Sequence, residues 1–456
     1  MSEDELEMLQ LQMGVDTARL EPHHFISYLF SQQNAPDFAK LFDDTLRDIA
    51  LTNNDVFAVK TDGGAKVVLF DRLSEYIADE SKRDDFCRAI INKLVEFSFE
   101  RIFTQKFDFY ATLFEYLIKD YNSNSGGKYA EYFTPHAVAR IMAEILVPKA
   151  QRGKIKNVSC YDPSAGSGTL LMNVAHAIGE NRCSIYTQDI SQKSSNLLRL
   201  NLILNNLVHS IPNVIQGNTI QYPYHKDGKE LKRFDYIVSN PPFKLDFSDF
   251  RDDLDSKENK ERFFAGLPNV PNKNKAGMSI YQLFLQHIIH SLKPGGKAAV
   301  VVPTGFITAQ SGIDKRIRQK LVDEKMLAGV VSMPSNIFAI PGINVFFLFI
   351  DDSNDGDVVL VDASNLGEKV KDGKNQKTVL TPEEEQQIID VFNTKRTVED
   401  LSVAVSYDEI EAKNYSLSAG QYFDVKIEYV DITPKQFAEK MQNFTSNLYD
   451  LFDQSR

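Results

Sequence analysis

The spacing of apolar residues divides the chain into a helical first part and an alternating second part. Up to about residue 124, apolar side chains recur every three or four residues, as in segments 38–51, 84–103 and 107–120. This is the period of an amphipathic helix. A small, polar run over residues 122–127 then has the composition of a loop. We therefore expect an all-α domain over residues 1–124.

From residue 128 to about 350, short apolar segments alternate with amphipathic ones. The expected strands are 157–161, 184–188, 213–216, 234–239, 296–302, 326–331 and 343–350, with helices between them such as 168–179 and 195–207. This alternation predicts an α/β, Rossmann-like domain with a mostly parallel, doubly wound sheet, which binds ligands at the carboxyl ends of its strands. We assign residues 125–375 to this domain.

Two further segments have a different character. Residues 243–276 are charged and show no period, and an irregular excursion of this length is usually functional or mobile. The last region, 376–456, is expected to be a C-terminal extension. Residues 381–456 hold 7 basic and 15 acidic side chains, and residues 434–452 have the pattern of an amphipathic helix.

Composition excludes several classes of protein. With 456 residues, 43% of them hydrophobic, the chain can form a core and is too long for one ordinary domain. Its acidic N-terminus does not resemble a signal peptide, and no apolar run approaches the roughly 18 residues of a membrane helix. We expect a cytoplasmic protein without a membrane contact. Cys87, Cys160 and Cys183 form no CxxC pair, so we expect neither disulfides nor a metal site.

The first candidate site is a glycine-rich turn directly after the strand expected at 157–161. Its residues in the sequence DPSAGSGT that point to ligand binding are Asp162, Ser164, Gly166, Ser167, Gly168 and Thr169. Glycines let a ligand approach backbone N–H groups at the start of a helix. The turn lacks the third glycine of the dinucleotide fingerprint, and by itself it is also compatible with a purely structural connection.

The next two expected strands are each followed by a polar residue. Asp189, with Ile190 after it, lies 27 residues beyond Asp162, which is close to the spacing at which such folds bind ribose hydroxyls. Asn218 follows the strand at 213–216, where its amide can pair with an adenine ring. A surface aspartate and a loop asparagine are the plainer interpretations, and the glycine-rich turn before them favours cofactor binding.

The strongest signal is the sequence Asn240-Pro241-Pro242-Phe243 after the strand at 234–239. Two prolines fix the backbone and remove two N–H donors, so the local carbonyl groups project rigidly. The amide oxygen of Asn240 and the carbonyl of Pro241 can then accept hydrogen bonds from one planar amino group. Phe243 offers a face on which a heterocycle can stack. We interpret these four residues as catalytic.

The turn DPSAGSGT followed by NPPF resembles the adenine-amino DNA methyltransferases. The segment KYAEYFTPH at 128–136 narrows the resemblance to the modification subunits of type I restriction–modification systems. The segments VSMPSNIF at 331–338 and NYSL at 414–417 extend it over nearly the whole chain. Two departures exist: the turn has Ser164 and Ala165 where the family often has Ala or Cys, and the ribose acid is Asp189 rather than Glu.

The resemblance implies S-adenosylmethionine as the cofactor. Ser167, Gly168 and Thr169 would approach it through backbone N–H groups, and Asp189 would hold its ribose. The methionine end would lie against a stretch just ahead of the turn, with the hydroxyl of Thr134 near its carboxylate. That stretch comprises Glu131, Tyr132, Phe133, Thr134, Pro135 and His136.

The resemblance also implies partners. The substrate would be double-stranded DNA with its target adenine flipped out of the stack. The net charge of −12 argues against a chain that grips DNA unaided, and the acidic residues after 350 offer no recognition domain. A separate specificity subunit is therefore expected, with two copies of this chain to one, and the sequence leaves open whether a restriction subunit joins them. The basic cluster at 315–320 could contact phosphate or form a solvated helix face.

Three other interpretations stay open. A self-sufficient adenine methyltransferase would need its own recognition domain, and none is evident. A glutamine- or guanine-directed methyltransferase can also carry an NPP-aromatic loop, but the EYFTP segment and the helical first part fit those families poorly. A non-catalytic assembly subunit would be expected to have lost the NPPF loop, which is intact.

Overall fold

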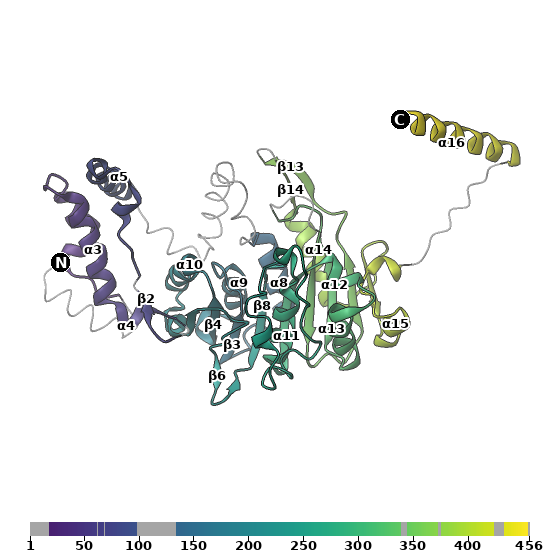
Figure 1. The fold of residues 1–456 in the computed structure, drawn as a ribbon, viewed down its shortest axis with the longest axis horizontal. Helices are drawn as coiled ribbons and strands as arrows, with labels where there is room; N and C mark the ends of the chain where they lie inside the picture. Colours follow the sequence, from purple (N-terminus) through teal and green to yellow (C-terminus); the bar gives the residue numbers. More distant parts are fainter. Residues whose placement is uncertain are drawn as a thin grey trace. The chain divides into compact units, whose positions relative to one another are not determined.

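A computed structural model describes residues 18–61, 63–67, 69–97, 134–338, 344–372, 375–423 and 433–454 (Figure 1). The chain divides into two compact units, Met1–Gln421 and Tyr422–Arg456. The helix expected at 107–120 and the predicted boundary at 124/125 lie outside the described residues. Within the described part, no helix is both long and apolar enough to cross a membrane.

The first unit is built on a sheet with eleven described strands, in the order β15-β12-β10-β11-β9-β8-β3-β4-β5-β1-β2. Their bounds are β1 Val59–Thr61, β2 Lys66–Val67, β3 Val158–Asp162, β4 Cys183–Asp189, β5 Val214–Gln216, β8 Phe234–Ser239, β9 Leu292–Pro303, β10 Leu327–Ser332, β11 Val345–Asp351, β12 Val358–Asp362 and β15 Ser402–Val405. All seven strands expected from the sequence are present, each within a few residues of its expected bounds.

Parallel pairing dominates this sheet. The strands from β9 through β8, β3, β4 and β5 to β1 all run parallel, and β10 pairs parallel with β12. Strand β11 is antiparallel to both of its neighbours, and β2 and β15 are antiparallel at the two edges. The expected mostly parallel sheet is confirmed. The chain leaves β3 toward β4 and β5 and returns to β8 on the other side, so the strand order reverses between β3 and β8.

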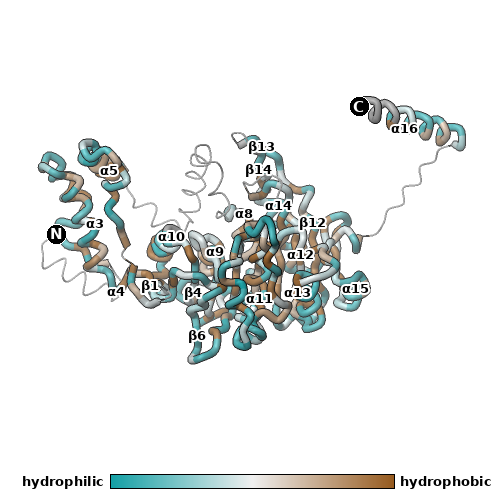
Figure 2. Tube along the Cα trace, viewed as in Figure 1, coloured by the Kyte–Doolittle hydropathy of each residue, from teal (hydrophilic) through white to brown (hydrophobic). Residues whose placement is uncertain are grey.

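Helices cover both faces of the sheet, which makes it doubly wound. Adjacent residues of β3 show this, because successive side chains of a strand point to opposite faces. Cys160 belongs to the large apolar cluster beneath α8 (His136–Leu146), α9 (Thr169–Ile178), α10 (Gln192–Leu204) and α14 (Pro382–Asn393). Tyr161 faces α11 (Tyr281–His290), where its hydroxyl lies 3.1 Å from Nε2 of His287. Figure 2 shows apolar residues concentrated along these central strands.

The N-terminal region is mostly helical but also extends the sheet. Helices α2 (Ile26–Ser31), α3 (Phe38–Thr52) and α5 (Arg83–Val95) enclose a small apolar core of their own. The expected all-α character needs one correction, because β1 pairs with β5 and β2 with β1. Strands of three and two residues are too short to show a period in the sequence. They are recognised only from their pairing in the structure, where β1 adds to the edge of β5.

Two other segments differ from their sequence patterns. The charged excursion 243–276 is packed rather than loose, since Phe247, Phe250, Leu254 and Phe263 form a buried cluster with residues around α11. Residues 376–421 supply α14, β15 and α15 (Tyr407–Ala412), which complete the first unit. The predicted boundary at 375/376 falls within the hairpin of β13 (Glu368–Asp372) and β14 (Asn375–Val379). The second unit contains α16 (Pro434–Gln454), close to the helix expected there.

Gly329 in β10 provides a test of this packing. A Cβ atom at this position would lie 2.3 Å from the carbonyl oxygen of Val359 and 2.6 Å from the ring of Phe392. We predict that Gly329→Ala lowers the free energy of unfolding by about 1–3 kcal/mol, the usual cost of overpacking a core. Gly305→Ala is the control, because nothing lies within 4 Å of its Cβ position. Urea unfolding should show a lower midpoint for the first variant alone, and equal midpoints would contradict the packing described.

Candidate active site

A cavity of about 320 Å³ opens at the carboxyl edge of the sheet, where the strand order reverses. Loops after β3, β4, β5 and β8 form it, which is where doubly wound folds bind ligands. The structure brings together the following predicted residues in its lining: Thr134, Asp162, Ser164, Gly166, Ser167, Thr169, Asp189, Ile190, Asn218, Asn240, Pro241, Pro242 and Phe243.

The glycine-rich turn lies close against its neighbours. Gly168 has φ +83°, and a Cβ atom there would come 2.1 Å from Cδ1 of Leu198 on α10. Gly166 also has a positive φ, of 54°. The side-chain amide of Asn201 donates to the carbonyl of Ser167 at 2.8 Å. Glycine adopts such left-handed conformations without strain, and at Gly168 the close approach of Leu198 leaves no room for a side chain.

The Asp189 carboxylate ties the loops together. Its Oδ2 accepts a hydrogen bond from the Gly166 N–H at 2.9 Å, and its Oδ1 accepts one from the Ser191 N–H at 2.8 Å. The Asp189 carbonyl accepts from the Gly217 N–H at 2.9 Å. Burial raises the pKa of Asp189, and the two N–H donors oppose this. Each carboxylate oxygen keeps a lone pair for a ligand hydroxyl.

Asp162 is buried at the end of β3, only 1% exposed. Its Oδ1 accepts from the Ser164 N–H at 2.9 Å, and burial raises the pKa of Asp162 to about 7. The hydroxyl of Ser164 lies 2.7 Å from that of Ser239, the last residue of β8. The glycine-rich turn is thereby joined to the strand that carries the NPPF loop.

The amide of Asn240 is oriented by a neighbour from far along the chain. Its Nδ2 donates to the hydroxyl of the buried Thr134 at 3.3 Å, which leaves the amide oxygen as an acceptor. Phe243 is half-buried and meets Tyr281 edge-to-face, with the ring centroids 6.2 Å apart. Tyr281 is held in turn by a hydrogen bond to Asp314. The first and last residues of the loop are therefore supported from outside the loop.

Other predicted residues do not line this cavity. Gly168 shapes the turn without lining the cavity, and Pro135 precedes α8. His136 is exposed and lines a separate depression of about 250 Å³ with Arg140 and His176. Glu131, Tyr132 and Phe133 lie outside the described residues.

Asn218 lines the cavity but is partly engaged in its own turn. Its Oδ1 accepts from the N–H groups of Ile220 and Gln221, at 3.1 and 3.2 Å. The amide nitrogen is therefore the group left to meet a ligand.

Several lining residues were missed by sequence reasoning: Lys244, which directly follows the NPPF loop, and Leu170, Thr219, Leu245, Ile280, Phe284, Phe338 and Val345. Phe338 had a signal, since it ends the VSMPSNIF segment. Thr219 follows Asn218 directly, and its hydroxyl donates to the carbonyl of Pro163 at 2.7 Å. Apart from Lys244, the others are apolar residues whose pattern does not differ from that of ordinary core positions.

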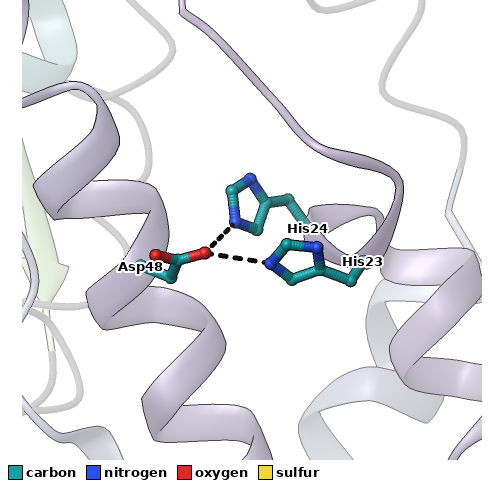
Figure 3. Close-up of side chains that lie close together, drawn as sticks. All are labelled: His23, His24 and Asp48. Atoms are coloured by element: carbon teal, nitrogen blue, oxygen red, sulfur yellow. Dashed lines mark hydrogen bonds and ion pairs between the residues drawn. The ribbon is translucent and has the colours of Figure 1, made fainter. Parts of the chain in front are cut away.

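Among the described residues, one trio has the composition of a metal site, and it lies in the N-terminal region. Nε2 of His23 and Nε2 of His24 each lie 2.9 Å from Oδ2 of Asp48 (Figure 3). The Nδ1 of His24 accepts a hydrogen bond from the Glu21 N–H at 3.0 Å. A neutral His24 therefore carries its proton on Nε2 and donates it to Asp48, so the lone pair a metal would need is already in use.

Comparison with known proteins identifies the family of this chain. Residues 105–429 match the N-6 DNA Methylase family. The chain belongs to this family. The matched residues include both the glycine-rich turn and the NPPF loop, which line the cavity.

Several curated relatives are type I restriction enzyme methylase subunits. The chain is 28% identical over 356 residues to the type I restriction enzyme MpnII methylase subunit of Mycoplasma pneumoniae, covering 75% of this chain and 62% of the relative. It is 26% identical over 438 residues to the HindI methylase subunit of Haemophilus influenzae, covering 91% and 89%. The chain spans 62% and 64% of the lengths of the M. pneumoniae relative and of the MjaIX methylase subunit of Methanocaldococcus jannaschii.

The fold is shared with a solved structure. The type I restriction-modification system methyltransferase subunit from Streptococcus thermophilus superposes with a TM-score of 0.72 at 22% identity, covering 92% of this chain and 84% of that one. This likeness confirms the α/β methyltransferase core expected from the sequence.

The raised pKa of Asp162 predicts a pH-dependent stability. The folded state holds a proton up to about pH 7, whereas the unfolded state loses it near the ordinary value of 3.8. The stability that this proton contributes is therefore complete below pH 3.8 and is lost as the pH rises through 7. We predict that Asp162→Asn raises the free energy of unfolding at pH 8 by up to about 4 kcal/mol relative to the wild type. Its urea unfolding midpoint should therefore lie higher. The difference should shrink toward pH 5, and a difference independent of pH would contradict the buried, protonated carboxyl.

Proposed function

We propose that this chain transfers a methyl group from S-adenosylmethionine to the exocyclic amine of adenine in DNA. The observation that carries the proposal is the orientation of Asn240. Thr134 engages its amide nitrogen, so the oxygen is left to accept a hydrogen bond beside the glycine-rich turn of the adjacent strand. A target amine and a cofactor would thus share one cavity.

The lining fits S-adenosylmethionine in shape and charge. Gly166 and Ser167 leave the backbone accessible, and Asp189 keeps acceptor capacity for ribose hydroxyls. The Asn218 amide nitrogen would meet the adenine ring. Burial raises the pKa values of the buried Asp162 and the half-buried Asp189, and both values would fall beside a cationic ligand, which favours a cofactor with positive charge. When bound, the cofactor supplies a sulfonium-activated methyl group.

The NPPF residues would prepare the acceptor nitrogen. The Asn240 oxygen and the Pro241 carbonyl would accept hydrogen bonds from the two N–H groups of a flipped adenine, which draws the nitrogen lone pair out of the ring. Phe243 would stack on the base, a contact worth about 1–3 kcal/mol. The role of the site is mainly to align two reactants. The proton that the methylated amine releases would pass to water by way of the oxygens that accept its N–H groups.

The proposed setting is the modification subunit of a type I complex, acting in the cytoplasm. Several relatives are named as type I methylase subunits. The net charge of −12 predicts weak DNA binding by the chain alone, because phosphate contacts supply most non-specific affinity. A specificity subunit, with two copies of this chain to one, would supply sequence recognition.

The α16 helix is our candidate for docking this subunit. Phe437, Met441, Phe444 and Leu448 recur at helical spacing and are between 49% and 66% exposed. Such a stripe is typical of a helix that packs on another helix.

Asn240→Ala tests the catalytic assignment. We expect it to lower the methylation rate of cognate DNA at least about 100-fold, the usual loss when one hydrogen bond to the reacting group is removed. Cofactor affinity, measured by calorimetry, should stay within a few-fold. Asn240→Asp keeps an acceptor oxygen and should retain more activity than Ala. Turnover by the Ala variant close to that of the wild type would remove Asn240 from the mechanism.

Phe444→Asp combined with Leu448→Asp tests the docking stripe. Two charges on the apolar face should abolish co-elution with the specificity subunit in gel filtration and, with it, site-specific methylation. Cofactor binding should not change. Gln442→Asp with Ser446→Asp adds the same charge to the opposite, exposed face and should leave assembly intact. Site-specific methylation by the purified chain alone would favour a self-sufficient enzyme instead.

A further inference from the structure

The β13–β14 hairpin stands at the same edge of the sheet as the cavity. It follows β12, which is parallel to β10 and hence runs in the same direction as β9, β8 and β3. The carboxyl end of β12 therefore lies on the ligand-binding edge. Figure 1 shows the hairpin projecting beyond the body of the sheet at that edge.

The base of this hairpin is held beside the cavity wall. The hydroxyl of Thr378 donates to the carbonyl of Ser335 at 2.6 Å, and its N–H donates to the carbonyl of Asn336 at 3.1 Å. Phe338, two residues further along, lines the cavity. On the other strand, the Gly367 N–H donates to the Glu384 carboxylate at the start of α14, at 2.8 Å. The hairpin is thus fixed at both strands.

One face of the hairpin carries two exposed lysines. Lys369 pairs with Thr378 and Lys371 with Gln376 across the two strands. Residues directly opposite each other share a face, so both lysines project on the side where Thr378 contacts Ser335. Both are exposed, and neither forms an ion pair with any described residue.

The four basic residues of the cluster at 315–320 are all engaged with other groups of the protein. In the cluster at 315–320, Arg318 is buried and donates to the carbonyls of Tyr415, Phe306 and Ala309. Arg316 donates to the carbonyl of Ala265, and Lys320 pairs with Glu324. The hairpin 368–379, in contrast, has four lysines and two acids in a chain with a net charge of −12.

We propose that this face of the hairpin binds the phosphate backbone of duplex DNA next to the nucleotide that enters the cavity. The inference rests on the proposed function. A base can reach the cavity only if the backbone on either side of it passes over this edge of the sheet, from which the hairpin with Lys369 and Lys371 projects. Lysines there fix the position of the duplex without reading its sequence.

The test measures how DNA binding by the full-length chain depends on salt. Each phosphate contact adds about 0.9 to the slope of log affinity against log salt concentration. We expect Lys369→Gln with Lys371→Gln to reduce the slope by about 1.8, measured by fluorescence anisotropy with a labelled duplex between roughly 50 and 200 mM salt. S-adenosylmethionine affinity, measured by calorimetry, should stay at the wild-type value.

The β6–β7 hairpin provides a matched control. It consists of Lys226–Asp227 and Glu230–Leu231, and it precedes β8, so it lies at the amino end of that strand, away from the cavity. Lys226 and Lys229 are both exposed there. Lys226→Gln with Lys229→Gln removes the same charge and should leave the slope unchanged.

The outcomes separate this proposal from the proposed function. If wild type and both variants bind DNA with one slope, the hairpin does not contact phosphate, and the proposed function stands. If both double variants reduce the slope equally, the effect is one of net charge and the hairpin proposal is overturned. If the wild-type chain binds S-adenosylmethionine but no duplex even at low salt, and the complex with the specificity subunit binds none either, the proposed DNA substrate is wrong.

A thiol variant locates the contact directly. All three native cysteines are buried, so Lys369→Cys introduces an exposed thiol. A duplex whose backbone carries a tether activated as a mixed disulfide should undergo thiol–disulfide exchange with this variant, releasing the leaving thiol, and should not do so with Lys229→Cys. Equal cross-linking of the two variants would overturn the proposed placement.

Discussion

The parallel pairing of β3 with β8 is the contact on which the site depends. The chain departs from β3 in one direction and returns to β8 from the other, so the loops after these strands separate and leave space between them. The 2.7 Å contact between the hydroxyls of Ser164 and Ser239 spans this division at its base. If the two strands were not neighbours, the glycine-rich turn and the NPPF loop would be two unrelated turns.

The sequence predicted the central strands because they are short apolar segments, mostly buried, that alternate with amphipathic helices. The edges could not be predicted in the same way. Strand β1 has three residues, and Arg199, far along the chain, donates to the carbonyls of Phe57 and Val67 around it. Strand β15 is formed by pairing with β12. Such short strands are stabilised by pairing with a neighbouring strand, and their own sequence pattern does not show which strand that is.

The same distinction applies to the site, where the loops could be predicted from the sequence and the side-chain orientations could not. Its loops could be predicted because a single glycine or proline in the sequence already indicates an unusual backbone conformation. The orientation of each side chain was not evident, because it comes from a distant partner. Asn240 depends on Thr134, and Phe243 packs on Tyr281. The sequence pattern of the excursion 243–276 did not predict that this segment is packed. Its charged residues surround a few phenylalanines that pack inward, and Arg262 is buried and donates to backbone carbonyls.

Charge placement links the cavity to the rest of the molecule. Arg199, Arg262 and Arg318 are fully or nearly fully buried, and each donates to backbone carbonyls, so these guanidinium groups stabilise loops and are closed to DNA. Burial raises the pKa of the buried Asp162 and of the half-buried Asp189, and a cationic ligand beside them would lower both pKa values. The interior thus favours a positively charged cofactor, while an acidic exterior repels a phosphate backbone except where exposed lysines project. This distribution of charge agrees with the proposed division of roles, in which this chain forms the cofactor site and a partner subunit holds the DNA.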